Sequence, residues 1–386
     1  MEDYKMNQNE MSIRMGDYPQ LDCEPRILLG PGPSQVHPRV LQSLSAPLVG
    51  HLDPYFLKIM DATQTLLRYV FQTTNRLTIP ISGTGSAAME AAVANFVEQG
   101  TSVLVCINGY FGNRLAEMAR RYGGDVETIT RPWGEIFTPE EIKAALQKKQ
   151  AKVVALVHAE TSTGALQPLE EIIKEVHKQG GVIIVDTVTS LGGMPVEVDD
   201  WGIDICYSGT QKCLGVPPGL GPITINSHAE EVLKARKTKI PSWYLDLSMV
   251  QAYWGSERTY HHTAPISMNF ALYEGLRMIA EEGLEARFIR HADHARLLWA
   301  GLEDLGLELH VPLEYRLPSL TTVRVPSGVN EAQVRARLLN EYNIEIAGGL
   351  GELKGKVWRI GLMGFSSRIE NITLLLGALK QVLKIP

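Results

Sequence analysis

The sequence predicts an α/β fold, in which a large domain with a mostly parallel sheet between helices precedes a smaller α+β domain. Up to about residue 280, short apolar runs rich in β-branched residues alternate with helical patterns, and this alternation favours parallel strands joined by right-handed crossovers. Beyond that point the alternation is replaced by long helices and isolated short strands. We place the boundary near 280–285, which gives an N-terminal arm (1–25), a large domain (26–282) and a small domain (283–386).

Five segments of the large domain have the composition of strands that are covered on both faces. Each is short, apolar and rich in valine or isoleucine, as expected for a sheet between two helical layers. Because parallel strands end at the same edge of a sheet, polar residues after these segments are candidates for a ligand site. The predicted strands are 102–107, 152–158, 182–186, 203–207 and 221–226.

Capping signals define the helices between these strands. In TPEEIKAALQKK, Thr138 is the predicted N-cap, Pro139 takes the first helical position and Glu141 closes a capping box. The segment PLEEIIKEVHKQGG has apolar residues at helical spacing and ends on glycine. A long amphipathic helix over 278–306 is predicted to break near Gly283.

The small domain carries the same two kinds of signal over shorter stretches. TTVRVP, IEIAGG and KVWRIGL are apolar and rich in β-branched residues, which predicts strands. Helical spacing predicts helices over about 330–342 and over 368–383.

Bulk properties exclude several classes of protein. The chain has 386 residues, of which 45% are hydrophobic and 21% charged, with a net charge of −6. This balance is typical of a soluble globular protein and indicates no nucleic-acid or anionic-membrane partner. No apolar run is long enough to span a membrane. The four cysteines have no metal-ligand spacing and the N-terminus lacks a signal-peptide pattern, so we expect no metal site and a reducing, cytoplasmic location.

A stretch of glycines and hydroxyl residues, SGTGSAAMEAAVANF (82–96), precedes an alanine-rich helix. Free N–H groups and the helix dipole at such a helix start suit a phosphate group. Gly83, Gly85 and Ala88 also match the dinucleotide fingerprint G-x-G-x-x-A, which requires an acidic residue after the next strand. That strand ends on Asn108 instead, so a nicotinamide-dependent dehydrogenase stays only as an alternative, as does a helix start that binds nothing.

Two charged residues stand at the ends of apolar runs. Asp186 closes GVIIVD, where a carboxylate is costly to bury without a partner; a helix cap or a salt bridge is the alternative role. Lys212 lies in YSGTQKCLGVPPG, and a desolvated lysine is a nucleophile for Schiff-base chemistry, whereas a surface charge is its ordinary alternative. A phosphate cradle, a carboxylate and a lysine together fit pyridoxal phosphate, which has a phosphate, a ring nitrogen and an aldehyde.

At this point the sequence resembles a known family, the fold-type I, class V aminotransferases, within its alanine–glyoxylate (serine–pyruvate) branch. The resemblance covers about 26–383, and Lys212 stands 26 positions after Asp186. It is carried by the segments LLGPGPSQVHPRV, SGTGSAAMEAA, HAETSTGALQPL, VIIVDTVTSLGG, YSGTQKCLGVPPG, YHHTAPI, IEIAGGLG and KVWRIGLMG.

The resemblance implies a role for each matching residue around the cofactor. Lys212 would form the Schiff base, and Asp186 would pair with the pyridinium nitrogen. Val188 and Phe111 would pack on the two ring faces, and Thr161 would hydrogen-bond the ring's phenolic oxygen. The phosphate would be held by Thr84, Gly85 and Ser86, helped by Gln211 and Ser208. Two of these positions depart from the family pattern, since close relatives often have tryptophan in place of Phe111 and histidine in place of Ser86.

The resemblance also implies a substrate site and a partner subunit. Arg359 matches the arginine that binds the substrate's α-carboxylate, with a structural salt bridge as the alternative. Gly32, in LGPGPS, would line the same mouth with backbone groups. Tyr260 and Thr263 resemble residues that reach the phosphate in the neighbouring subunit, which implies a homodimer.

The expected activity is transfer of an amino group from alanine or serine to glyoxylate by a ping-pong mechanism. Ureidoglycine–glyoxylate transamination shares the motifs and stays open, and a non-catalytic cofactor-binding protein is the alternative from another class. A cysteine desulfurase would need a thiol on a small-domain loop, and no cysteine follows Cys213.

Overall fold

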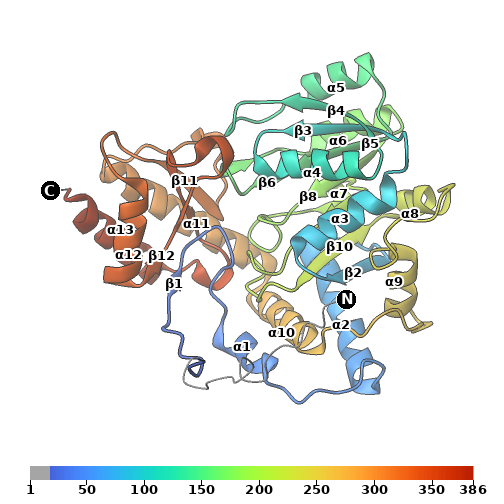
Figure 1. The fold of residues 1–386 in the computed structure, drawn as a ribbon, viewed down its shortest axis with the longest axis horizontal. Helices are drawn as coiled ribbons and strands as arrows, with labels where there is room; N and C mark the ends of the chain where they lie inside the picture. The colour runs from blue at the N-terminus through green and yellow to red at the C-terminus, as the bar shows by residue number, and fades with distance from the viewer. Residues whose placement is uncertain (1–17, 386) are drawn as a thin grey trace, which may run out of the picture.

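A seven-stranded sheet organises the larger lobe of the computed structural model, which describes residues 18–385 (Figure 1). The strand order is β2–β10–β9–β8–β5–β3–β4. Helices lie on both sides of this sheet, so the predicted α/β fold class is confirmed. The strands are β2 (Leu77–Ser82), β3 (Ser102–Ile107), β4 (Asp125–Thr130), β5 (Val153–Val157), β8 (Val182–Asp186), β9 (Ile205–Tyr207) and β10 (Leu220–Ile225).

The sheet is parallel except at β10. The pairs β3–β4, β3–β5, β5–β8 and β8–β9 are parallel, whereas β10 is antiparallel to both β9 and β2. The expectation of parallel pairing was wrong for β10, because the turn that carries Lys212 joins it to β9 without a crossover helix. Periodicity does not reveal β2, which contains Pro80, or β4, whose residues are half-exposed or exposed.

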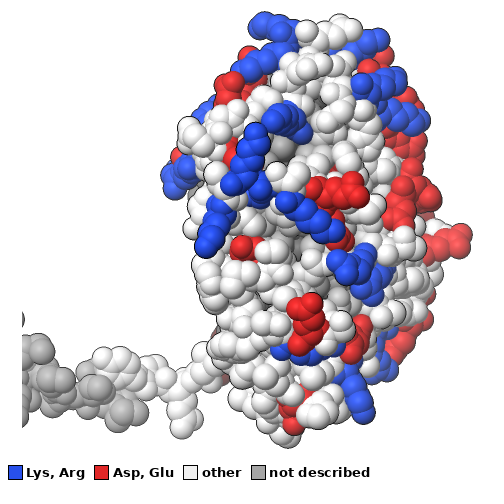
Figure 2. Space-filling model, turned by 90° about the vertical axis from the view of Figure 1, so that its right-hand side faces the viewer, with Lys and Arg blue, Asp and Glu red and all other residues white. Residues whose placement is uncertain are grey.

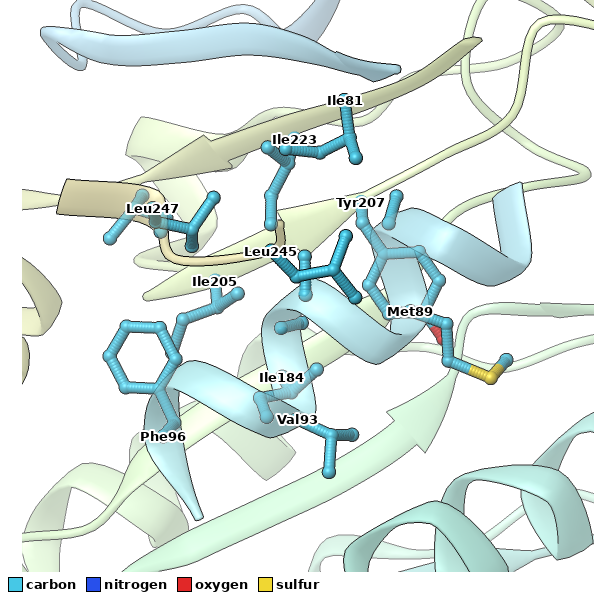
Figure 3. Packing of buried hydrophobic residues seen from close by; sticks show 14 of the residues in the cluster. Ile81, Met89, Val93, Phe96, Ile184, Ile205, Tyr207, Ile223, Leu245 and Leu247 are labelled. Carbon is cyan, nitrogen blue, oxygen red and sulfur yellow. The ribbon is translucent and has the colours of Figure 1, made fainter. Parts of the chain in front are cut away.

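Alternate residues of β3 show how the two helical layers cover the sheet. Val103 and Val105 point into one buried cluster with α3 (Gly85–Phe96) and α4 (Tyr110–Arg121). Leu104 and Cys106 point into a second cluster, against α5 (Pro139–Lys148), α6 (Glu170–Lys178), α2 (Pro54–Phe71) and α10 (Ile266–Glu282). In Figure 3, Met89, Val93 and Phe96 of α3 pack in the first cluster with Ile184 and Ile205 of the sheet.

The predicted helix signals are present where they were expected. At the start of α5, Thr138 accepts from the Glu141 N–H and the Glu141 side chain accepts from the Thr138 N–H, which makes a full capping box. Gly283 separates α10 from α11 (Leu284–Asp304), and its φ of +83° is a conformation that other residues rarely adopt. The remaining helices of the larger lobe are α1 (Pro38–Leu44), α7 (Val198–Trp201), α8 (Ser227–Lys234) and α9 (Leu247–Trp254).

The smaller lobe, at the left of Figure 1, is built around an antiparallel sheet. Its strand order is β11 (Leu320–Arg324), β14 (Val357–Gly361) and β13 (Ala347–Gly348), and α11, α12 (Glu331–Tyr342) and α13 (Ile369–Leu383) contribute to its core. Near the start of the described chain, β1 (Ile27–Leu28) pairs with β12 (Ile344–Glu345). A short hairpin, β6 (Ala159–Glu160) with β7 (Ala165–Leu166), follows β5.

Several predictions concern ends or surfaces rather than the core. Residues 1–17 of the predicted arm lie outside the described residues.

Figure 2 views the molecule from the right of Figure 1, and Lys and Arg side chains gather on the upper part of that face. From residue 18 to residue 385, no helix is long and apolar enough to cross a membrane. The same residues contain no cluster of three or more His, Cys, Asp or Glu side chains arranged for a metal ion.

Candidate active site

The carboxyl ends of three neighbouring parallel strands bring the predicted residues together. Val157 of β5 is paired with Asp186 of β8, and Asp186 is paired with Tyr207 of β9. The segment that follows each strand contains one of the predicted site residues: Thr161 after β5, Val188 after β8 and Lys212 after β9. In open α/β sheets this edge is where ligands bind.

Asp186 is buried with its carboxylate held in place but not neutralised. It is 2% exposed, and its two oxygens accept hydrogen bonds from the Val188 N–H and the Tyr207 hydroxyl, each at 2.8 Å. Burial raises the pKa of the Asp186 carboxyl to about 6, although both hydrogen bonds act in the opposite direction. A positive group placed against Asp186 would therefore favour its ionised form.

Lys212 lies in the turn between β9 and β10 and is also buried, with 7% of its surface exposed. Its ammonium donates to the Pro31 carbonyl, and the Ser34 hydroxyl donates to the Lys212 carbonyl at 2.8 Å. Burial lowers the pKa of the Lys212 amine to about 8, and the positive charge of Arg359 acts in the same direction. Lys212 is therefore closer to its nucleophilic, uncharged form at neutral pH than an exposed lysine.

Gly32 is the residue that leaves room for this lysine. Its φ is +105°, and a Cβ atom built there would lie 2.6 Å from Cδ of Lys212. Only glycine combines that backbone conformation with so close an approach. The segment 31–34 thus packs directly on the Lys212 side chain, as expected for the mouth of the site.

The loop after β2 has free hydrogen-bond donors. Thr84 is the N-cap of α3 but its hydroxyl makes no capping bond, and the N–H groups of Gly85 and Ser86 find no acceptor within residues 18–385. A Cβ at Gly85 would stand 3.4 Å from both the Gly209 Cα and the Val188 side chain. This close approach places the loop against the turn that carries Lys212.

Three polar side chains of the turn before Lys212 differ in whether they form a hydrogen bond. Within the described chain, the side-chain oxygen of Gln211 is buried without a hydrogen-bond partner. Ser208 donates to the Thr187 carbonyl at 3.1 Å, and Thr210 donates to the Pro217 carbonyl at 2.7 Å. The hydroxyls of Ser208 and Thr210 therefore shape the turn, and the expected help of Ser208 in holding a phosphate stays a prediction.

The residues predicted to surround a ring come from three elements. Thr161 is buried, and its hydroxyl is hydrogen-bonded to that of Thr189. Phe111, in the first turn of α4, and Val188 are half-buried, and both pack against the cluster drawn in Figure 3. One surface of each side chain thus remains open to a ligand.

Arg359 is a buried cation without a counter-ion. It lies on β14, is 5% exposed, and donates from Nε to the Gly348 carbonyl at 2.8 Å and from Nη1 to the Thr161 carbonyl at 3.1 Å. Burial lowers the pKa of its guanidinium to about 10, so it stays charged at neutral pH. In residues 18–385 no carboxylate lies within 4 Å of it, unlike the pair Arg335–Glu331 of the same lobe. The alternative role of Arg359, a structural salt bridge, finds no partner there.

Tyr260 and Thr263 do not join this buried group within one chain. The Tyr260 side chain is 57% exposed, Thr263 is exposed, and their hydroxyls lie 3.5 Å apart. The neighbouring His262 nevertheless reaches the end of β2, where its Nε2 lies 2.6 Å from the Ser82 hydroxyl. The segment therefore lies beside the loop that follows β2 in its own chain, while Tyr260 and Thr263 are exposed.

Two buried residues of the site were not anticipated. Tyr207 orients Asp186, and Glu160, which is fully buried, accepts from the Phe111 N–H at 3.1 Å and from the Ser162 hydroxyl at 2.6 Å. Burial raises the pKa of the Glu160 carboxyl despite these bonds. A carboxylate at the N-terminus of α4 also complements the helix dipole. The signal that could have identified Glu160 was its place, like Asp186, just after an apolar strand.

Comparison with known proteins agrees with this arrangement. The family model described as aminotransferase class V matches residues 27–358.

The chain belongs to the class V aminotransferases.

Its relatives align with nearly the whole of this chain. It is 43% identical to an (S)-ureidoglycine–glyoxylate transaminase of Bacillus subtilis, over 94% of this chain and 91% of the relative, and 42% identical to the alanine–glyoxylate aminotransferase of Rattus norvegicus, over 94% and 89%. A crystal structure of alanine–glyoxylate aminotransferase from Nostoc sp. superposes with a TM-score of 0.94 at 56% identity, covering 97% of this chain and all of that one. The fold-type I neighbours include a pyridoxamine–pyruvate aminotransferase at 28% identity.

As a class V aminotransferase, the protein is an enzyme that uses pyridoxal 5′-phosphate. The residues present fit this cofactor on three independent features. Within residues 18–385 the Thr84 hydroxyl and the N–H groups of Gly85 and Ser86 donate to no acceptor, as a phosphate site requires. A buried carboxylate at Asp186 and a buried amine at Lys212 match a ring nitrogen and an aldehyde.

Proposed function

We propose that this aminotransferase transfers an amino group from alanine or serine to glyoxylate, giving glycine and a 2-oxo acid by a ping-pong mechanism. Two lines support the proposal. Several of the most similar proteins are named for glyoxylate as the acceptor. The site offers the buried cation Arg359 for the carboxylate that all these small substrates share.

The observation that carries the proposal is the buried guanidinium of Arg359, which has no carboxylate within 4 Å among residues 18–385. A planar guanidinium binds a carboxylate through two parallel hydrogen bonds, and it does so most strongly out of water. Because Nε and Nη1 already donate to the Gly348 and Thr161 carbonyls, the orientation of the fork is set before substrate arrives. A substrate with one carboxylate satisfies it.

When bound, pyridoxal phosphate supplies a ring that withdraws the electron pair from the substrate's α-carbon. Asp186 would hold the proton on the ring nitrogen, and Tyr207 and the Val188 N–H keep that carboxylate in position. Thr84, Gly85, Ser86 and Gln211 would hold the phosphate.

Lys212 would carry out the proton transfer. Its lowered pKa leaves a substantial uncharged fraction near neutral pH, so with the cofactor bound the amine would take the proton from the substrate's α-carbon and would then pass it to the cofactor. The Pro31 carbonyl accepts a hydrogen bond from the free amine. The packed turn 31–34 keeps water from this side of the lysine.

A second substrate is favoured by one relative. The 43% identical transaminase of Bacillus subtilis is named for (S)-ureidoglycine as the donor. That donor would use Arg359 and Lys212 in the same way, and would differ only in what surrounds its side chain. Ureidoglycine–glyoxylate transamination is therefore the second candidate for the donor side of the reaction.

We also propose that the enzyme is a homodimer in which Tyr260 and Thr263 complete the partner's phosphate site. Two observations support the proposed dimer. Tyr260 and Thr263 are exposed within one chain, and His262 contacts Ser82 beside the phosphate loop. A two-fold axis near this loop would bring each pair of hydroxyls to the other subunit's site.

A matrix of donors and acceptors on the purified enzyme tests the proposed substrates. Alanine, serine and (S)-ureidoglycine are each paired with glyoxylate, pyruvate and 2-oxoglutarate, and Lys212→Ala serves as the control. We expect glyoxylate to give the highest kcat/KM, and parallel lines in double-reciprocal plots. A preference for 2-oxoglutarate would contradict the proposed acceptor, and (S)-ureidoglycine as the best donor would replace alanine and serine.

A further inference from the structure

Arg114 is a half-buried arginine on α4 to which none of the roles above applies. It stands four residues after Tyr110 and three after Phe111, so its side chain lies on their face of the helix and points back toward the N-terminus. The guanidinium carbon is 4.8 Å from the centre of the Phe111 ring and 5.4 Å from that of Tyr110. The cation therefore covers the ring that is predicted to stack on the cofactor.

The same guanidinium contacts the phosphate loop. Nη1 of Arg114 donates to the Ser86 hydroxyl oxygen at 3.0 Å. Because the Ser86 oxygen accepts this bond, the hydroxyl hydrogen is free to donate to a further acceptor. No other side chain of the described residues connects α4 to Ser86 by a hydrogen bond.

The charge of Arg114 is not neutralised by a carboxylate. On the same helix, Arg121 pairs with Glu117 at 2.8 Å, whereas no acidic side chain of residues 18–385 lies within 4 Å of Arg114. Its positive charge also opposes the rise in the pKa of buried Tyr207, the residue that donates to Asp186. The Arg114 cation thus lies between the Phe111 ring and the loop with free N–H donors at Gly85 and Ser86. This arrangement favours an anionic ligand that also has an aromatic ring.

We propose that Arg114 is a positioning residue for the cofactor: it holds Ser86 ready to donate to the phosphate, contributes positive charge beside that phosphate, and supports Phe111 against the ring. The inference rests on the placement of the phosphate at Thr84–Ser86 proposed above. It explains how phenylalanine and serine serve at positions 111 and 86, since one arginine ties the two side chains together.

Cofactor binding to the full-length chain tests this role independently of turnover. The dissociation constants of pyridoxal 5′-phosphate and of phosphate-free pyridoxal are measured for the wild type, Arg114→Gln and Ser86→Ala. Arg120→Gln is the matched control, because Arg120 is exposed on the same helix and its side chain makes no hydrogen bond or ion pair with the described residues. The readout is the ratio of the two constants, which general damage to the fold leaves unchanged.

We expect Arg114→Gln to reduce the preference for the phosphorylated form by about 10-fold, the size of one hydrogen bond to a charged group. Arg120→Gln should leave the ratio at the wild-type value, and Arg114→Lys should restore part of it through charge alone. The double variant Ser86→Ala/Arg114→Gln should lose less than the sum of the two single effects, because Arg114 acts partly through Ser86.

The outcomes separate this inference from the proposed phosphate site. An unchanged ratio in Arg114→Gln with a reduced ratio in Ser86→Ala overturns the role of Arg114 and leaves the phosphate placement standing. An unchanged ratio in both variants overturns the placement itself. Fully additive losses in the double variant overturn the claim that Arg114 acts through Ser86.

Discussion

The two ends of the cofactor site differ in how far one chain completes them. Lys212, Asp186 and Arg359 are almost entirely buried and are held by hydrogen bonds from their own chain. Tyr260 and Thr263 are exposed, and among the described residues their hydroxyls lie near each other alone, at 3.5 Å. The contrast indicates that the reacting end is preorganised when the chain folds, and it supports the proposal that a second subunit completes the phosphate end.

The largest expected effect concerns the reacting end. Lys212→Ala should lower kcat by on the order of 10⁴-fold, because it removes both the amine that holds the aldehyde and the group that moves the proton. Lys237→Ala is the matched control, since Lys237 is exposed. Steady-state kinetics at saturating substrate provide the measurement. A variant that retained more than about one hundredth of wild-type kcat would mean that Lys212 is not the proton carrier.

Asp186→Asn is expected to lower kcat by about 10²–10³-fold, because an amide cannot hold the proton on the ring nitrogen as a carboxylate does. It should also change the pH dependence of folding. The pKa of Asp186 rises from 3.8 to about 6 on folding, so its stabilising effect is present below about pH 4 and is lost as the pH rises through about 6.

Chemical denaturation of the cofactor-free protein between pH 4 and 8 measures this effect. The wild type should lose on the order of 1–3 kcal/mol of unfolding free energy over this range relative to Asp186→Asn. Identical pH profiles for the two proteins would show that the buried carboxyl titrates normally.

Arg359→Ala should reduce kcat/KM for both amino acid and keto acid by about 10–100-fold, mainly through KM, because one charge-assisted carboxylate contact is lost. Arg359→Lys should retain only part of the wild-type kcat/KM, since lysine cannot reproduce the planar fork of the guanidinium. The absorbance of the bound cofactor is the internal control and should not change. Equal losses for substrates with and without an α-carboxylate would assign Arg359 a purely structural role.

The smallest effect is expected at the exposed end. Tyr260→Phe combined with Thr263→Ala should weaken cofactor binding by about 10-fold through two lost phosphate contacts. A hybrid dimer with a Lys212→Ala chain distinguishes the subunits. If the hydroxyls act on the partner's site, the hybrid contains one site with intact Lys212, Tyr260 and Thr263, and that site binds cofactor with wild-type affinity. A hybrid with only weakened sites would show that the pair serves its own chain.

Local rules predicted those parts of the fold that depend on neighbours in sequence. The capping box at Thr138 and the helix break at Gly283 were predicted correctly, because both depend on a few consecutive residues. The direction of β10 was not, since it depends on what joins two strands rather than on the strand itself. β4 was missed because an edge strand with half-exposed residues has no continuous apolar run.

The residues of the site also fall into those that the sequence reveals and those that depend on contacts between elements. Asp186 stands out in the sequence because a carboxylate after an apolar run is costly to bury without a partner. Lys212 stands out because it follows in a glycine-rich segment that matches the family. Arg114 and Tyr207 do not, because their role depends on which residues meet across elements: Arg114 of α4 meets Ser86 of α3, and Tyr207 of β9 meets Asp186 of β8. Only the spacing of Arg114 from Phe111 hinted at a contact.

The central claim, that the buried amine of Lys212 holds the cofactor, is tested most directly by borohydride reduction of the holoenzyme followed by peptide mass spectrometry. The mass of the reduced cofactor should be found on the peptide that contains Lys212, with loss of the visible absorbance and of activity. A reduced adduct on any other lysine, or no adduct with undiminished absorbance, would contradict the claim.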